Sequence, residues 1–311
     1  MSECSKVLIT GGAGFVGSHL VDSFLLEGYR IVVLDNFEFG RMENVNVHLK
    51  NENFVFVEGD IRDRKTVRRA MKGVDAVIHL AALIDVEESV KNPCETFDVN
   101  VTGTFYVLEE AVRSGVQRFV YASSTVVYGD TDQLPLCEDF PFKLLSPYAA
   151  SKASSECYCM AFHETYGLET VVLRYFNIYG CGQEHNPYGG VVIRFVKNAL
   201  KGKPLTVFGN GNQTRDFVYV DDVVRATMLA LENSDAVGKV FNVCTGTATS
   251  VNDLVCALED IVGRKLRVNY SAPRKGDIRY SYGDPLLAKK MLGFEAKTEL
   301  RSGLERLLKS M

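Results

Sequence analysis

The chain has 311 residues, of which 46% are hydrophobic and 24% are charged, and its formal net charge is −4 at pH 7. This length exceeds one typical domain and is enough to bury a sizeable core, so we expect a large unit joined to a smaller one. The slightly acidic balance argues against broad binding to nucleic acid or to anionic membranes.

The sequence carries no targeting or metal-binding signal. No apolar run is long enough to span a bilayer, and the apolar segment 7–9 is not preceded by the basic and apolar regions of a signal peptide. The eight cysteines include no Cys-x-x-Cys pair, and the five histidines lack the compact spacing of metal ligands. We therefore expect a cytoplasmic protein with reduced thiols and no metal.

Short runs rich in Val and Ile alternate with amphipathic stretches through the first half, as in βαβ units around a parallel sheet. Nearly continuous hydrophobicity in these runs indicates strands buried on both faces. The pattern predicts an α/β fold with a doubly wound parallel sheet of the Rossmann type, whose ligand lies across the carboxyl ends of the strands. Predicted strands cover residues 6–10, 31–35, 54–58, 76–80, 119–123 and 170–175, and helices are predicted to begin near Ala13, Arg64, Asn100 and Tyr148.

After about residue 180, Gly, Pro and Asn separate shorter elements, which predicts a smaller C-terminal α/β lobe. We expect a main domain over residues 1–180 and the lobe mainly over 181–311. Segments around 206–243 are expected to return to the main domain, because 206–208 and 240–243 have the character of sheet strands. Two stretches, 105–108 and 157–162, are apolar nearly all round, which indicates either burial within one chain or a homodimer interface.

The segment TGGAGFVG at 10–17 follows the first predicted strand and opens the first helix. Gly11 suits a tight turn, Gly14 the close approach of a pyrophosphate, and Gly17 the close packing of helix on strand. The unpaired N–H groups and the dipole at that helix N-terminus favour a phosphate. Glycines also mark plain turns, so the motif owes its weight to its place between strand and helix.

Asp35 ends the second strand at the distance from the glycines where a carboxylate binds an adenosine ribose hydroxyl and repels a 2′-phosphate. We therefore predict NAD rather than NADP, although Arg41 nearby would soften that repulsion. Asp60 and Ile61, at the end of the third strand, suit a place beside the adenine. The cofactor contacts predicted from this part of the chain are Gly11, Gly14, Phe15, Val16, Gly17, Asp35, Asn36, Asp60 and Ile61.

Tyr148 and Lys152 lie four residues apart, on one face of a predicted helix. A nearby cation favours the phenolate, so we expect Lys152 to lower the pKa of Tyr148 toward a range useful for proton transfer. Tyr-x-x-x-Lys is common by chance. Here it follows Ser123 and Ser124 at a strand end, where a hydroxyl would project toward a nicotinamide, and this favours acid–base chemistry beside the cofactor.

Ten segments together carry a resemblance to a known family: TGGAGFVG, LDN at 34–36, GDIRD at 59–63, HLAA at 79–82, NVTGT at 100–104, SSTVVYG at 123–129, SPYAASK at 146–152, RYFNIYG at 174–180, QTRDFVYVDD at 213–222 and RKGD at 274–277. With these segments the sequence resembles the extended short-chain dehydrogenase/reductase superfamily, most closely its UDP-glucose 4-epimerase branch, over essentially the whole chain. The segments are highly specific for the superfamily and less so for the reaction.

The resemblance implies that Ser124, Tyr148 and Lys152 are catalytic. It adds six residues to the NAD site, which Tyr148 and Lys152 would share: Leu80, Ala81, Ala82, Asn100, Ser123 and Tyr175. It places a UDP-sugar mainly in the C-terminal lobe, with two arginines that would neutralise the pyrophosphate. The implied substrate contacts are Ser124, Asn177, Val191, Thr206, Phe208, Arg215, Arg274 and Asp277.

The resemblance implies the NAD-dependent 4-epimerisation of a UDP-hexose through a transient 4-keto sugar. Tyr148 would take the proton of the sugar 4-hydroxyl while hydride passes to a tightly held NAD. A 4,6-dehydratase or a UDP-glucuronate decarboxylase shares this first step, but such families carry acidic residues just after the catalytic hydroxyl, where this chain has Thr125 and Val126. A non-catalytic dinucleotide sensor is a further alternative, although such relatives characteristically lose the Tyr–Lys pair.

The sequence departs from the narrowest epimerases at one position. In those that accept only glucose and galactose, a Tyr four residues after the Asp of Arg-x-Gly-Asp closes the pocket near the sugar C2 substituent. That position is Ser281 here. We expect Ser281 to leave room for an N-acetyl group, so that UDP-GlcNAc and UDP-GalNAc interconvert as well. The alternative is that Tyr280 or Tyr282 fills the space.

Overall fold

A seven-stranded parallel sheet forms the centre of the structure, a computed structural model that describes residues 5–183, 189–273 and 278–311. Its strand order is β11-β6-β5-β4-β1-β2-β3. The six predicted strands are confirmed, each to within one residue at either end. The strands of this sheet are β1 (Lys6–Thr10), β2 (Arg30–Asp35), β3 (Phe54–Glu58), β4 (Ala76–His79), β5 (Arg118–Ser124), β6 (Glu169–Tyr175) and β11 (Lys239–Val243).

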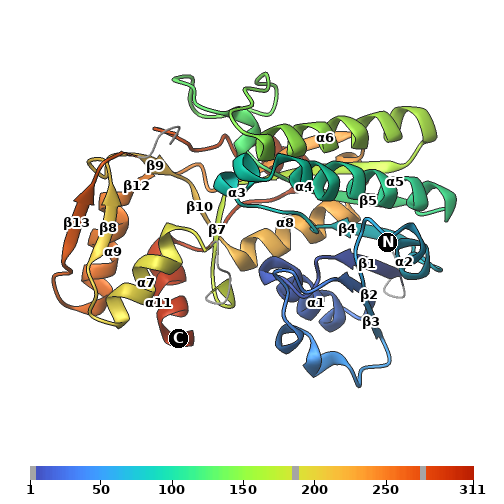
Figure 1. Ribbon diagram of the computed structural model, residues 1–311, viewed down its shortest axis with the longest axis horizontal. Helices are drawn as coiled ribbons and strands as arrows, with labels where there is room; N and C mark the ends of the chain where they lie inside the picture. Colours follow the sequence, from blue (N-terminus) through green and yellow to red (C-terminus); the bar gives the residue numbers. More distant parts are fainter. Residues whose placement is uncertain (1–4, 184–188, 274–277) are drawn as a thin grey trace.

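Alternate residues of these strands enter two cores, one on each face of the sheet. Val7 and Ile9 of β1 pack with residues of α1 and α8, whereas Leu8 packs with residues of α2, α5 and α6. Successive side chains of a strand point to opposite faces, so a strand that is apolar throughout needs helices on both sides. The doubly wound α/β prediction is confirmed (Figure 1). These helices are α1 (Phe15–Leu26), α2 (Arg64–Ala70), α5 (Thr104–Arg113), α6 (Pro147–Tyr166) and α8 (Val220–Glu232).

Three of the four predicted helix starts lie within two residues of the observed ones. The start predicted near Asn100 is wrong, because the helical segment already begins with α4 (Pro93–Phe97). Proline suits the first turn of a helix, where its missing N–H has no partner to lose. The helix continues through a π-helical stretch, Asp98–Gly103, into α5, and a short helix, α3 (Val86–Lys91), precedes it.

The C-terminal lobe has its own core and lies beside the main sheet (Figure 1). The strand predicted at 240–243 joins the main sheet as β11, next to β6. The prediction that 206–208 also returns there is wrong, because β8 (Leu205–Phe208) pairs in parallel with β13 (Val268–Ser271). Leu205 and Val207 are buried in the core of the lobe, and the apolar pattern of so short a strand does not specify which sheet it joins.

The remaining elements complete the lobe and its junction with the sheet. None of the helices in the described ranges combines the length and the hydrophobicity needed to cross a bilayer. The helices are α7 (Val191–Leu200), α9 (Val251–Val262), α10 (Leu286–Leu292) and α11 (Leu300–Ser310). The strands form two further pairs, β7 (Asn177–Tyr179) with β10 (Phe217–Tyr219), and β9 (Thr214–Arg215) with β12 (Thr249–Ser250). Single 3₁₀ turns are η1 (Met42–Asn44), η2 (Asn46–His48), η4 (Thr125–Tyr128) and η6 (Ser234–Ala236).

Candidate active site

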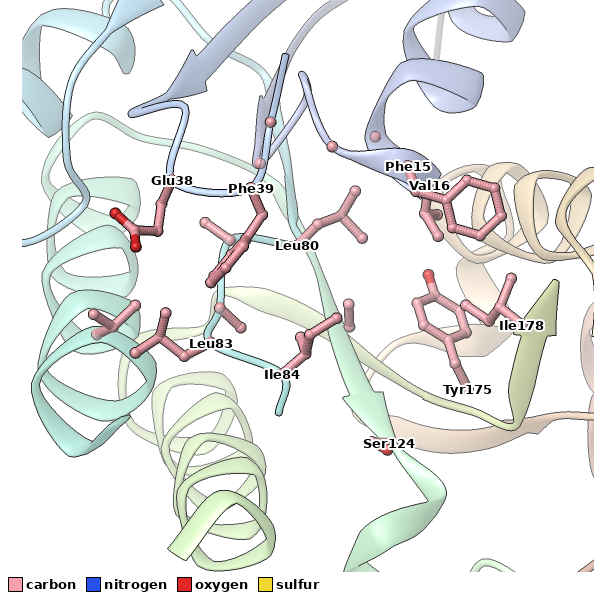
Figure 2. Close-up of a pocket in the computed structure, with 18 of the residues that line it drawn as sticks. Phe15, Val16, Glu38, Phe39, Leu80, Leu83, Ile84, Ser124, Tyr175 and Ile178 are labelled. Carbon is pink, nitrogen blue, oxygen red and sulfur yellow. The ribbon is translucent and has the colours of Figure 1, made fainter. Parts of the chain in front are cut away.

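A cavity of about 500 Å³ lies at the carboxyl ends of the main strands, where the loops after β1, β2, β3, β4, β5 and β6 meet Arg215 and the segment that contains Ser281. Open parallel sheets place their ligands at this edge. Figure 2 shows the cavity with two groups of side chains around it. One group contains Phe39, Leu80, Leu83 and Ile84, and the other contains Phe15, Val16, Tyr175 and Ile178.

The turn after β1 brings two backbones too close for side chains. Gly11 has a φ of +71°, and a Cβ on it would lie 2.9 Å from the backbone nitrogen of Ala81. A Cβ on Gly17 would overlap the carbonyl oxygen of Gly11, so α1 packs directly on the turn. Gly14 is the N-cap of α1 and uses no side chain. This bare backbone cradle at a helix N-terminus suits a pyrophosphate.

Asp35 closes the cavity at the end of β2. Its carboxylate accepts hydrogen bonds from the backbone N–H groups of Ala13 at 2.9 Å and Phe37 at 2.8 Å. Burial raises the pKa of Asp35, while these two bonds favour its ionised form. Asn36 donates to Asp60 at 3.0 Å, so the predicted ribose and adenine contacts form one polar edge.

Ser124 and Tyr148 face each other across the junction of β5 and α6. Ser124 is the last residue of β5, and Tyr148 is the second residue of α6, whose N-cap is Ser146. The phenol of Tyr148 is hydrogen-bonded to Ser124, and its backbone N–H donates to the hydroxyl of Ser89 at 3.2 Å. One helical turn further on, Lys152 is 4% exposed and its Nζ donates to the carbonyl of Ala122 at 2.8 Å.

The pKa values of this pair differ from the sequence expectation. Burial raises the pKa of Tyr148 to about 12, against a smaller lowering by the hydrogen bond from Ser124. Burial lowers the pKa of Lys152 to about 8, against a raising effect of the carboxylate of Glu156. The expected lowering of the phenol pKa by Lys152 is therefore wrong in this structure, because burial dominates the pKa of Tyr148 and the ammonium of Lys152 is bonded to the carbonyl of Ala122.

Most residues predicted for the site do line this cavity. Among the described residues, Asn100, Val191, Thr206 and Phe208 are not part of its wall. Arg274 and Asp277 lie outside the described residues. The predicted residues that line the cavity are Gly11, Gly14, Phe15, Val16, Gly17, Asp35, Asn36, Asp60, Ile61, Leu80, Ala81, Ala82, Ser123, Ser124, Tyr148, Lys152, Tyr175, Asn177, Arg215 and Ser281.

Asn100 lies behind the wall of the cavity. Its side chain bonds the N–H of Leu83 at 2.8 Å and the carbonyl of Leu83 at 2.9 Å, and it donates to the hydroxyl of Ser151 at 2.9 Å. It is 1% exposed. Asn100 thus holds the loop after β4, whose residues Leu80–Ile84 form the wall, and ties that loop to α6.

Three buried polar atoms of the wall have no hydrogen-bond partner within the part of the chain that the structure describes: Thr125 Oγ1, Asn177 Oδ1 and Gln183 Oε1. The amide of Gln183 donates to the carbonyl of Ile178 at 3.2 Å, so its free atom is the oxygen, an acceptor. A buried polar atom without a partner is costly unless a ligand or water satisfies it. The sequence did not lead us to Gln183, because an amide after a glycine-rich turn resembles any loop residue.

A family model described as the NAD dependent epimerase/dehydratase family matches residues 7–244. Similar solved structures include UDP-glucose 4-epimerase of Thermotoga maritima with UDP-glucose, which is 39% identical over 98% of each chain with a TM-score of 0.92. UDP-N-acetylglucosamine 4-epimerase of Methanobrevibacter ruminantium, in complex with UDP-N-acetylmuramic acid, is 34% identical over 99% of this chain and 98% of that one, with a TM-score of 0.94. UDP-glucuronic acid 4-epimerase of Bacillus cereus, with UDP-glucuronic acid and NAD, is 32% identical over 98% of each chain with a TM-score of 0.91.

The chain belongs to the NAD dependent epimerase/dehydratase family. Within that family it is an NAD-dependent enzyme of the UDP-sugar 4-epimerase group. The cradle at Gly11 and Gly17, and the carboxylate of Asp35, fit the pyrophosphate and the ribose of the cofactor.

Proposed function

We propose that the protein interconverts UDP-glucose and UDP-galactose with bound NAD, and that it also accepts the N-acetylated pair. The observation that carries the proposal is one cavity whose wall contains both Tyr148 with Lys152 and Asn177 with Arg215 and Ser281. The proposed proton-transfer group, the proposed cofactor cradle and the proposed nucleotide contacts thus line the same cavity. A sensor without chemistry would not need a buried phenol bonded to a serine hydroxyl.

Tyr148 is proposed to take the proton of the sugar 4-hydroxyl, with Ser124 bonded to the same oxygen. Bound NAD would be held by the cradle at Gly11 and Gly17 and by the carboxylate of Asp35, and it would supply the acceptor for the hydride of sugar C4 and the donor that reduces the 4-keto sugar again. The raised pKa of Tyr148 means that its work as a base needs a nearby positive charge, and Lys152, in the next turn of α6, is proposed to supply it in the complex with NAD and substrate.

Arg215 is proposed to bind the pyrophosphate of the substrate. Its Nη1 donates to the carbonyls of Thr214 and Ile278, each at 2.8 Å. These bonds hold the guanidinium in the cavity wall before any ligand arrives, and a guanidinium pairs well with phosphate oxygens.

The proposal for N-acetylated sugars rests on Ser281, which is 4% exposed and lies in the cavity wall. Tyr280 and Tyr282 are not in that wall. Arg279 stacks over the ring of Tyr280 at 5.1 Å, and the carbonyl of Tyr282 accepts from the N–H of Leu136 at 2.9 Å. The ring of Tyr280 is therefore engaged with Arg279, and neither neighbouring tyrosine lines the cavity, which supports a space at Ser281 that an acetamide fills.

UDP-glucuronate is the main rival substrate, since a similar epimerase of Bacillus cereus binds it. A carboxylate on the sugar needs hydrogen-bond donors. Gln183 presents a buried acceptor, and Asn177 Oδ1 is also unpaired among the described atoms. These atoms match the hydroxyl or amide N–H groups of neutral hexoses better than a negative charge. Thr125 and Val126 supply no acid for a dehydratase.

The test is to incubate the purified protein with UDP-galactose, without added reductant, and to resolve the products by anion-exchange chromatography. We expect UDP-glucose to form, and UDP-GalNAc to give UDP-GlcNAc in a parallel reaction. A third reaction with UDP-glucuronate is expected to give little product. Turnover of UDP-glucuronate alone would contradict the proposal. Turnover of UDP-galactose but not of UDP-GalNAc would contradict the part of the proposal that concerns N-acetylated sugars.

We also propose a homodimer built on α5 and α6. Phe105 of α5 packs against Tyr158 of α6 at a ring distance of 5.5 Å, and Tyr158 and Tyr166 are 42% and 59% exposed. Such a row of half-exposed aromatic rings on two outer helices suits a self-complementary contact. Light scattering during size-exclusion chromatography is expected to give twice the mass of one chain, and Tyr158→Glu is expected to give a monomer.

A further inference from the structure

The helix face that carries Tyr148 and Lys152 continues to a buried carboxylate, Glu156. The three residues are spaced four apart on α6, so they form one row along the helix. Glu156 is 2% exposed. A charge so far from water is retained only where it is paired, and its removal changes the local field strongly.

Arg174 of β6 pairs with Glu156. Its Nε lies 3.1 and 3.2 Å from the two carboxylate oxygens, and its Nη2 donates to Oε2 at 2.8 Å. Arg174 is itself 3% exposed, and its Nη1 donates to the hydroxyl of Tyr128 at 2.9 Å and to the carbonyl of Glu138 at 3.0 Å. The pair is therefore a buried, bidentate contact that has few alternative geometries.

The same carboxylate reaches the strand that carries Ser124. The hydroxyl of Ser123 donates to Glu156, and Lys152 donates to the carbonyl of Ala122 at 2.8 Å. Two successive turns of α6 thus hold two successive residues of β5. The next residue of that strand is Ser124, so its place opposite Tyr148 depends on both contacts.

We propose that Glu156 and Arg174 are positioning residues for the proton transfer. Their ion pair holds the end of β5 against α6, and the guanidinium neutralises the carboxylate that lies one turn from Lys152. The inference rests on the proposed roles of Tyr148 and Lys152. A neutral pair adds no net charge of its own to the field at Lys152 and Tyr148, whereas an unequal pair would add one to the field at both groups.

The other groups near Lys152 do not supply this balance. Burial and the charge of Lys152 lower the pKa of His79 to about 3, so this residue is neutral at physiological pH. Burial raises the pKa values of the Cys159 thiol and of the Tyr121 phenol, so both are uncharged as well. The titratable and charged groups that face Lys152 or its paired neighbours are Tyr148, Glu156 and Cys159 of α6, His79 of β4, Tyr121 of β5, Arg174 of β6, Tyr128 of η4, and Glu138.

The test compares two variants that break the same ion pair with opposite charge. Glu156→Gln leaves the guanidinium unbalanced. Added positive charge favours the deprotonated forms of both Tyr148 and Lys152, so both pKa values fall and the whole pH–rate profile moves to lower pH, by roughly one unit. Arg174→Met leaves the carboxylate unbalanced and moves the profile to higher pH. The double variant is expected to return it toward the wild-type position.

Loss of stability alone predicts no such difference in sign. Melting temperature and NAD content are measured for every variant, and the profile is compared only between folded, NAD-loaded proteins. Arg118→Met is the matched control: Arg118 is 6% exposed, pairs with Glu169 at 2.9 Å and stands at the opposite end of β5. The Arg118→Met variant is expected to have a lower melting temperature and an unchanged pH–rate profile. If Glu156→Gln does not fold, Arg174→Lys, which keeps the charge, is compared with Arg174→Met and is expected to show no shift.

Shifts in the same direction, or no shift in folded variants of an active enzyme, would overturn the inference. The proposed function fails differently, because a wild-type protein that turns over none of the UDP-sugars has no profile to move. A profile that moves with Arg118→Met would also overturn it, since the effect would then follow from lost stability at either end of β5.

Discussion

The two halves of the cavity are built by different means. The proposed cofactor half depends on close backbone packing: Gly11 and Gly17 remove side chains where α1, β1 and the loop at Ala81 meet. The proposed substrate half is made of side chains, such as Asn177, Arg215 and Ser281, which come from segments far apart in the chain. The first half therefore requires positions without side chains, whereas the second requires particular polar side chains.

This contrast also explains which half tolerates change. A Cβ on Gly11 or Gly17 would clash, because the nearest atoms belong to the backbone and cannot move aside as a flexible side chain can. In the proposed substrate half, some buried atoms, such as Gln183 Oε1, have no partner among the described residues, so a new side chain there would change which ligand groups they can bond. We therefore expect a substitution in the glycine turn either to abolish NAD binding or to leave it intact. A substitution in the substrate half is expected to change the sugar preference gradually.

The largest effect is expected at Tyr148, where the two halves meet. Tyr148→Phe removes the hydroxyl and keeps the ring, so turnover is expected to fall by about 10²–10⁴-fold while NAD remains bound. Initial rates with UDP-galactose and the NAD content of the purified variant measure this. Tyr158→Phe, on an exposed part of the same helix, is the control and should retain full rate. A rate within a few-fold of wild type would remove Tyr148 from the chemistry.

Arg215→Ala is expected to weaken the nucleotide contact and to leave the cofactor half intact. Loss of a charge-assisted hydrogen bond costs about 1.5–3 kcal/mol, which weakens UDP binding roughly 10- to 100-fold. Calorimetric titration with UDP measures the change. Arg279→Ala is the matched control, because that exposed arginine stacks on Tyr280 and is not in the cavity wall. Unchanged UDP affinity in Arg215→Ala would place the pyrophosphate elsewhere.

Gly17→Ala tests the cofactor half by adding a single methyl group. The new Cβ would lie 2.7 Å from the Cα of Gly12, so the turn must shift at a cost of about 1–3 kcal/mol. We expect less bound NAD and a lower melting temperature. Gly190→Ala is the control, because its Cβ would meet no atom of the described residues within 4 Å. Full NAD content in Gly17→Ala would show that the cradle adapts.

The same contrast decides how much the sequence reveals. The strands and the glycine turn could be predicted, because hydrophobic runs and missing side chains are local signals, and Asp35 follows from its place at a strand end. The partners of Asn100, the free oxygen of Gln183 and the pairing of β8 with β13 depend on segments distant in sequence. The raised pKa of Tyr148 could not be predicted either, since the spacing reveals a nearby cation and not the burial that raises the pKa.

The smallest expected effect, and the sharpest test of the contrast, is a change in sugar preference at Ser281. Ser281→Tyr places a ring in the cavity wall, where an acetamide at sugar C2 is proposed to lie. Crowding of about 1–3 kcal/mol would lower kcat/KM for UDP-GalNAc relative to UDP-galactose by roughly tenfold or more. NAD content should not change, because Ser281 belongs to the substrate half. Ser281→Ala separates two causes: a preserved ratio means that space alone admits the N-acetyl group, and a reduced ratio means that the hydroxyl bonds it. A ratio unaffected by the tyrosine would show that Ser281 does not face the sugar.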